Sequence, residues 1–105
     1  MDVDNDIEVW LETDQNRGNL MTPYLQSKTP QVLEYRLRAR KKGRSGRSEI
    51  TQSGSVRLSR GKPTALGSIG MSVAQGDDCY IELSLVDGGA LIASYILSCP
   101  EPVAQ

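Results

Sequence analysis

The chain of 105 residues suits one domain, and 38 % hydrophobic residues, ten glycines and no phenylalanine favour strands and turns over a helical bundle. The absence of histidine excludes Ser-His and Cys-His catalytic pairs and histidine metal sites. No apolar run approaches the roughly 18 residues of a transmembrane helix, and the acidic start leads us to expect no signal peptide. The net charge of −1 conceals ten bases and one acid, Glu49, within residues 36–62. The local field is therefore more informative than the total charge.

Residues 1–5 are expected to form a flexible acidic tail, residues 6–100 a single domain, and residues 101–105 a flexible C-terminus. Residues 7–12 have the period of two of a half-buried strand, and residues 14–19 have the composition of a turn. Residues 20–26 are expected to form a second short strand. Pro23 would confine that strand to the edge of a sheet because proline has no N–H to donate.

The clearest strand covers residues 33–42, after a break at residues 27–30. Its apolar face consists of Leu33, Tyr35, Leu37 and Ala39. Its opposite face carries Glu34 and four cations, Arg36, Arg38, Arg40 and Lys42. We expect a hairpin loop at residues 43–46, a return strand over residues 48–59 closed by residues 61–63, and a turn at residues 75–78. Between them, residues 65–73 are expected to form a weaker strand interrupted by Gly67 and Gly70.

The last two predicted strands, on either side of residues 87–90, can be placed in register by their apolar faces. A loop spanning residues 88–90 pairs Leu85 with Ala93, Leu83 with Tyr95, Ile81 with Leu97, and Cys79 with Cys99. A two-residue loop would match the apolar faces less well, so we prefer the first register. Six or seven strands without any helical period predict an all-β fold, an antiparallel sandwich of immunoglobulin-like type.

Cys79 and Cys99 have three interpretations. The preferred register would place them close enough to form a disulfide, which would clamp one end of the sandwich and imply an oxidising compartment. They could also be two buried thiols. A redox-active pair is disfavoured because there is no Cys-X-X-Cys motif and no flanking base.

The strip of cations is the strongest functional signal. Like charges at this spacing repel, so the arrangement costs stability unless a partner offsets it. Most of the bases are arginines, which favour bidentate contact with carboxylate or phosphate. A solubilising face, or an edge strand charged against aggregation, is the alternative. The predicted binding surface consists of Arg36, Arg38, Arg40, Lys41, Lys42, Arg44, Arg47 and Arg57.

Other chemistry has weaker support in the sequence. No glycine-rich motif has phosphate-loop spacing, and Asp77-Asp78 is more typical of a solvated turn than of a metal site. We expect no enzymatic activity, no catalytic residue, no metal and no cofactor. Nucleic acid is disfavoured as a partner because its binding strips usually interleave aromatic residues, and Tyr35 would point inward.

Several short motifs at matching spacing resemble the CsgC-like family, and within it the CsgH branch. These motifs are Gly43-Arg44-Ser45-Gly46-Arg47-Ser48, Gln52-Ser53-Gly54, Leu58, Pro63, Leu66, Asp77-Asp78 and Val86-Asp87-Gly88. The resemblance covers residues 33–100. It implies an immunoglobulin-like sandwich, a periplasmic location without membrane insertion, and inhibition of amyloid formation by the major curli subunit.

The resemblance also implies that the cationic strand face and its loop contact this client through complementary charge, and we expect the protein to be a monomer. Some family members carry a Cys-X-Cys pair where this chain has Gln31-Val32-Leu33. A redox role is therefore doubtful here, and the resemblance implies a structural role for Cys79 and Cys99. A polyanion-binding or nucleic-acid-binding module and a thiol-disulfide oxidoreductase remain the alternative functions.

Overall fold

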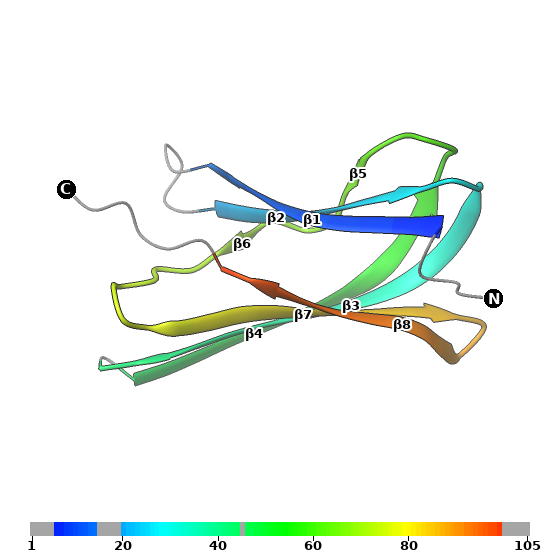
Figure 1. Ribbon diagram of the computed structural model, residues 1–105. Coiled ribbons are helices and arrows are strands. Elements are labelled where there is room, and N and C mark those ends of the chain that lie inside the picture. Colours follow the sequence, from blue (N-terminus) through cyan, green and yellow to red (C-terminus); the bar gives the residue numbers. More distant parts are fainter. Residues whose placement is uncertain (1–5, 15–19, 45, 100–105) are drawn as a thin grey trace.

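The computed structural model describes residues 6–14, 20–44 and 46–99, so the predicted tails and most of the predicted turn at residues 14–19 lie outside it. Strands form two antiparallel sheets stacked in two layers (Figure 1). The predicted all-β sandwich is therefore confirmed. Among the described residues there is no helix long and apolar enough to cross a membrane.

The smaller sheet consists of β1 (Ile7–Asp14), β2 (Leu20–Ser27), β5 (Thr64–Ala65) and β6 (Ile69–Gly70). The prediction that Pro23 confines β2 to an edge is wrong, because β1 pairs along one side of β2 and β5 and β6 pair along the other. The carbonyl oxygen of Pro23 accepts a hydrogen bond of 2.9 Å from the N–H of Leu66, in the gap between β5 and β6. The N and C=O of a residue in an antiparallel strand point to the same neighbour. The missing N–H of Pro23 therefore removes no hydrogen bond to β1.

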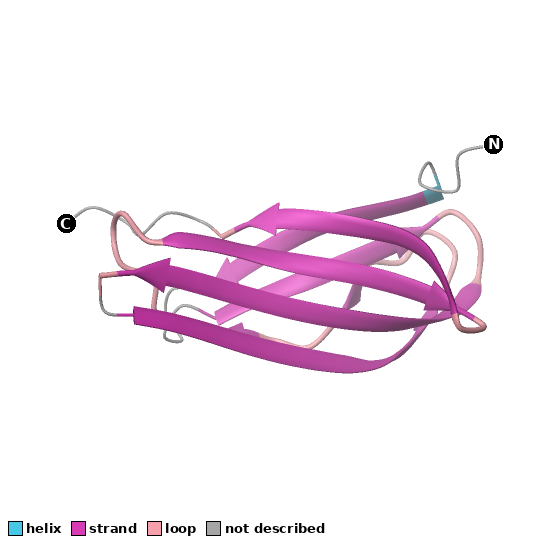
Figure 2. Cartoon of the chain, turned by 90° about the horizontal axis from the view of Figure 1, so that it is seen from below, coloured by secondary structure: helices cyan, strands magenta, loops and turns pink. Residues whose placement is uncertain are grey.

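The larger sheet has the strand order β4-β3-β7-β8, and its four long strands lie side by side in Figure 2. Their bounds are β3 (Gln31–Gly43), β4 (Gly46–Leu58), β7 (Asp78–Asp87) and β8 (Ala90–Ser98). Each predicted long strand is found at these positions. The weaker strand predicted over residues 65–73 is reduced to β5 and β6, which are separated at Gly67.

The predicted register of β7 and β8 is confirmed, because Leu85, Leu83 and Ile81 pair with Ala93, Tyr95 and Leu97. The connection is shorter than predicted. Gly88 and Gly89 form a two-residue turn with φ values of 59° and 86°, which glycine adopts without strain. A bulge between Leu85 and Val86 then shifts the pairing by one residue. The two-residue turn and the pairing of the apolar faces require registers that differ by one residue, and the bulge allows both.

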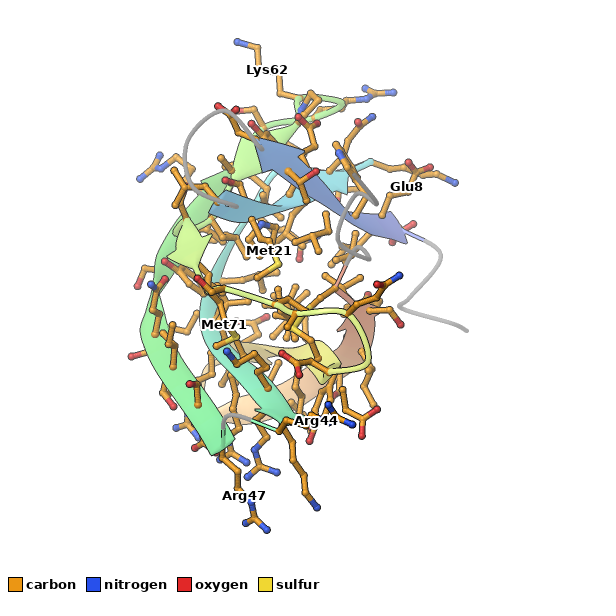
Figure 3. All side chains as sticks on the ribbon, turned by 90° about the vertical axis from the view of Figure 1, so that its left-hand side faces the viewer. Glu8, Met21, Arg44, Arg47, Lys62 and Met71 are labelled. Atoms are coloured by element: carbon orange, nitrogen blue, oxygen red, sulfur yellow. A yellow bond between two sulfur atoms is a disulfide. The ribbon has the colours of Figure 1, made fainter. Side chains whose placement is uncertain are left out.

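The core lies between the two sheets and follows the period of two along each strand. In β3, Leu33, Leu37 and Ala39 are at most 1 % exposed, and Tyr35 packs against the core from the same face. The residues of opposite parity face away from the smaller sheet. Met21 and Met71 fill the space between the layers (Figure 3). Burial of this apolar surface is the main stabilising contribution to the fold.

A disulfide joins Cys79 at the start of β7 to Cys99 just after β8, with 5.4 Å between the Cα atoms. The N–H of Cys99 also donates a hydrogen bond of 3.3 Å to the carbonyl oxygen of Cys79. Of the three interpretations of this pair, the disulfide is the one found. It fixes the last residues of β8 to the sheet.

We predict that replacing both Cys79 and Cys99 with alanine lowers the free energy of unfolding by about 3 kcal/mol. The bridge joins residues that are 20 positions apart and so reduces the conformational entropy of the unfolded chain. Urea denaturation followed by circular dichroism measures the loss. The wild-type protein in excess dithiothreitol should unfold at the urea midpoint of the variant. An unchanged midpoint in the variant would show that the bridge contributes nothing to stability.

Candidate protein-binding surface

The cationic surface lies on the outer face of β3, because the apolar residues of this strand face the core. With Leu33, Leu37 and Ala39 buried, the period of two sends the side chains of opposite parity to the outer face of the larger sheet. Four of these side chains are cations. We call them the basic face, which consists of Arg36, Arg38, Arg40 and Lys42. All four residues are exposed.

The position of β3 in the sheet tests one alternative to a binding surface, that of an edge strand charged against aggregation. β3 lies between β4 and β7, so it is an inner strand. Charged residues protect a sheet against aggregation when they lie on an edge strand. The basic face therefore does not serve as edge protection.

Neighbouring strands bring carboxylates to the basic face. Nε of Arg40 lies 2.8 Å from Oε2 of Glu49 on β4, and Nε of Arg38 lies 4.0 Å from Oε1 of the same carboxylate. From β7, Glu82 lies opposite Arg38 in the antiparallel register. Part of the positive charge is therefore neutralised within the protein.

Arg40 is the most strongly bound of these cations. Its Nη1 donates a hydrogen bond of 3.3 Å to the hydroxyl of Tyr80, and its Nε donates one of 2.8 Å to Glu49. The hydrogen bond to Tyr80, followed by that to Glu49, raises the pKa of Arg40 above its ordinary value. Arg40 thus stays fully charged and held in one orientation.

The remaining cations have less local compensation. Arg36 lies between Ser53 on β4 and Ser84 on β7, and within the described residues it forms no ion pair. Lys42 lies between Arg47 and Asp78, at the end of the sheet. Together with Arg44 in the hairpin loop, these residues carry the positive charge that is available to a partner.

An open hollow lies at the hairpin end of this face. Its lining residues are Arg40, Lys41, Lys42, Arg47, Ser48, Glu49, Asp78 and Tyr80. Four of them are cations with long flexible side chains. Their arrangement suits the reception of a carboxylate or another small anionic group carried by a partner.

Two predicted members of the surface lie apart from the basic face. Lys41 has the opposite parity in β3, and its ammonium group donates a hydrogen bond to the carbonyl oxygen of Ser72 in the β6–β7 connection. Arg57 is on the neighbouring strand but lies opposite Val32, with Glu34 between that row and Arg36. Lys41 therefore holds a loop, and Arg57 does not lie beside the other cations as expected.

Lys62 lies still farther from the basic face. Figure 3 shows it at the opposite end of the molecule from Arg44 and Arg47. It follows the isolated bridge between Ser27 and Arg60, which belongs to the region of the smaller sheet. Because of this separation, Lys62 and the neighbouring cations Lys28 and Arg60 can serve as controls for the basic face.

Sequence reasoning missed the contribution of β7, which places Asp78, Tyr80 and Glu82 beside the basic face. Their alternation with apolar residues marked β7 as a strand. Only its pairing with β3, about 40 residues earlier in the chain, places these three side chains next to the cations.

The sequence profile of the thin aggregative fimbriae synthesis protein family, Tafi-CsgC, matches residues 4–97. The chain belongs to this family. The family resemblance predicted from the motifs of the two hairpins is thus confirmed. No match is found among the curated proteins.

Two solved structures share the fold of this Tafi-CsgC chain. The Escherichia coli curli protein CsgC superposes with a TM-score of 0.68 at 19 % identity, covering 88 % of this chain and 94 % of the other. CsgH of R. palustris superposes with a TM-score of 0.66 at 15 % identity, covering 89 % and 90 %. The two matches span almost the whole of each relative, so this chain shares the fold of both proteins.

We predict that Glu49→Gln increases the affinity for polyglutamate about two- to fivefold at low salt, because it frees Arg40 and Arg38 from their shared carboxylate. Fluorescence anisotropy of a labelled polyglutamate peptide measures the affinity. Asp87→Asn makes the same charge change at the opposite end of the sheet and serves as the control. Equal affinities of the two variants would contradict a local role of Glu49.

Proposed function

We propose that this protein is a periplasmic chaperone that inhibits amyloid formation by the major curli subunit. The basic face makes transient electrostatic contact with the client. Membership of the Tafi-CsgC family supports a curli protein as the partner. The protein acts by binding, without a catalytic step.

The observation that carries this proposal is the position of the basic face on an inner strand. Four cations stand in one row on a sheet face, although neither edge protection nor the core requires cations at these positions. Mutual repulsion makes such a row unfavourable in isolation. A partner with carboxylates at matching positions would offset that repulsion.

The expected mode of action follows from the strength of such contacts. Exposed charges attract a partner over roughly 10 Å and raise the rate of encounter, but each contact stabilises the complex only modestly. Growth of a cross-β nucleus requires strands whose edges can pair. A client held briefly on the basic face is removed from that pairing, and a chaperone that releases it quickly can act on many molecules.

The disulfide between Cys79 and Cys99 supports a periplasmic location. Such bridges persist in oxidising compartments and are rare in the bacterial cytosol. The two cysteines are 20 residues apart and sit at the ends of paired strands, where they cross-link the sheet. This placement favours a structural role over thiol-disulfide exchange.

One observation favours the competing function, the binding of nucleic acid. The ring of Tyr80 lies next to Arg40, so an aromatic residue accompanies the cations after all. The carboxylates of Glu49, Asp78 and Glu82 share the same face and would repel a phosphate backbone. We therefore favour a protein client, whose charges are mixed and spaced more widely. Titration with single-stranded DNA at physiological salt tests this choice, and tight, salt-steep binding would contradict it.

We predict that the triple variant Arg36→Glu, Arg38→Glu and Arg40→Glu no longer extends the lag time of curli subunit assembly, because the attraction becomes repulsion. Thioflavin T kinetics at a low molar ratio of chaperone to client measures the effect. The side chains of Arg38 and Arg40 are 48 % and 45 % exposed, so the fold should be retained, as circular dichroism will verify.

The matched control is the triple variant Lys28→Glu, Arg60→Glu and Lys62→Glu. It has the same net charge change, but its substitutions lie in exposed loops away from the basic face. It should inhibit as the wild type does. Equal loss of inhibition in both variants would show that total charge, and not the basic face, is responsible.

We also predict that inhibition by the wild-type protein weakens as sodium chloride is raised from about 0.1 M to about 1 M, because the Debye length falls from about 10 Å to about 3 Å. The lag time with chaperone is compared at each salt concentration with the lag time of the client alone. Inhibition that is independent of salt would contradict the electrostatic mechanism.

A further inference from the structure

The two edges of the larger sheet are protected very differently. The edge strand β4 exposes Arg47, Glu49 and Arg57, and the side chain of Gln52 near its middle donates a hydrogen bond of 3.3 Å to the carbonyl oxygen of Ser68. The edge strand β8 contains no charged residue in its nine positions. Folded proteins usually protect an exposed edge with charges, proline or a covering loop. Only β4 has such charges.

Apolar side chains are concentrated along β8. Of the three large hydrophobic residues that are exposed in the described chain, Leu91 is 64 % and Ile96 is 69 % exposed, and both belong to this strand. Leu91 lies opposite Val86 and Ile96 opposite Glu82 of β7, so both face the outer side of the sheet. These two residues expose an apolar side at the edge on the same surface as the basic face.

The backbone of β8 is suitable for pairing with another strand. The bulge between Leu85 and Val86 affects only the part near the turn, and from Ala93 to Ser98 the pairing with β7 is regular. β8 ends the strand order of the larger sheet, so its other side has no strand partner within the described residues. Six residues in regular extended conformation can pair with a further strand through main-chain hydrogen bonds.

We propose that the free edge of β8 pairs with an uncharged, strand-forming segment of the amyloid-forming client. This inference rests on the proposed function and adds a second contact to the basic face. Segments that build cross-β structure combine high β propensity with low net charge. Such a segment matches Ser94, Ile96 and Ser98 on one side of β8, whereas a charged strand would find no counter-ion along it.

The distance between the two contacts allows one client molecule to use both. Neighbouring strands are about 4.8 Å apart, so β8 is about 10 Å from β3 and a strand added to β8 would be about 14 Å away. Three to five residues of extended chain span that distance. An acidic stretch that flanks the strand-forming segment would therefore reach Arg36 or Arg38 across β7. The basic face collects the client, and β8 occupies the strand edge that the next client molecule would need.

Ile96→Lys tests the proposal because it places a charge on the edge at an exposed position. The concentration of this variant needed to double the lag time of the major curli subunit should rise at least tenfold, while its affinity for polyglutamate does not fall below that of wild type, because the added cation lies on the same face as the basic face. Val32→Lys is the matched control, since Val32 is 57 % exposed on the same outer face but lies on the inner strand β3, and it should inhibit as wild type does. Ile96→Thr, uncharged and β-branched, should also retain inhibition and verifies that the site tolerates substitution.

Hydrogen exchange gives an independent measurement on the wild-type protein. Addition of the curli subunit should slow exchange of the amides of residues 93–98 that point away from β7. Equal inhibition by Ile96→Lys and Val32→Lys, or protection of β4 in place of β8, would overturn the proposal. Protection of β8 without client, together with a dimer in solution, would identify a second copy of this chain as the occupant and would overturn it as well. Failure of wild-type inhibition itself would instead refute the proposed function.

Discussion

The pairing of β3 with β4 on one side and β7 on the other is the constraint on which the rest of the structure depends. It places Leu33, Leu37 and Ala39 in the core and, by the period of two, their cationic neighbours outside. A slip of one residue would exchange the two faces and bury arginines without partners, at a prohibitive cost. The core therefore fixes the orientation of the basic face, which needs no stabilising contact of its own.

The same pairing limits how positive the surface becomes. Glu49 of β4 lies opposite Arg40, and Glu82 of β7 lies opposite Arg38. The positive charge that is not compensated lies at Arg36, which has serines on both sides, and at Arg44 and Arg47 near the hairpin loop. On the proposed function, such a mixed surface favours a partially acidic polypeptide over a uniform polyanion, whose phosphates would be repelled by Glu49 and Glu82. Weak, selective attraction is what the proposed chaperone needs in order to release its client.

Local patterns were sufficient to predict the long strands and the register of β7 with β8, since each depends on residues close in sequence or on one apolar face. That register places Cys79 near Cys99, but the sequence alone left three interpretations of the pair open. Features that depend on distant segments were not predictable. The sequence near Pro23 predicts an edge strand because proline lacks an N–H. The strands β5 and β6, which pair with β2 on the side of Pro23, come about 40 residues later in the chain. Lys41 is predicted to extend the strip toward the hairpin loop, and only the fold shows that its ammonium group donates a hydrogen bond to the carbonyl oxygen of Ser72. Tyr80 lies beside the basic face only because β7 pairs with β3.

The inner position of β3 also separates charge from pairing capacity. Cations on an edge strand would both attract a client and repel strand addition at the same place. Here the cations are on β3, and β7 stands between them and β8, so the edge of β8 remains uncharged while the face beside it is positive. An edge left in this state is a liability for a protein that never meets a strand-forming partner, because it invites aggregation. For the proposed chaperone, whose client forms cross-β structure, we propose that the same edge is a means of recognition, since main-chain pairing requires no particular client sequence.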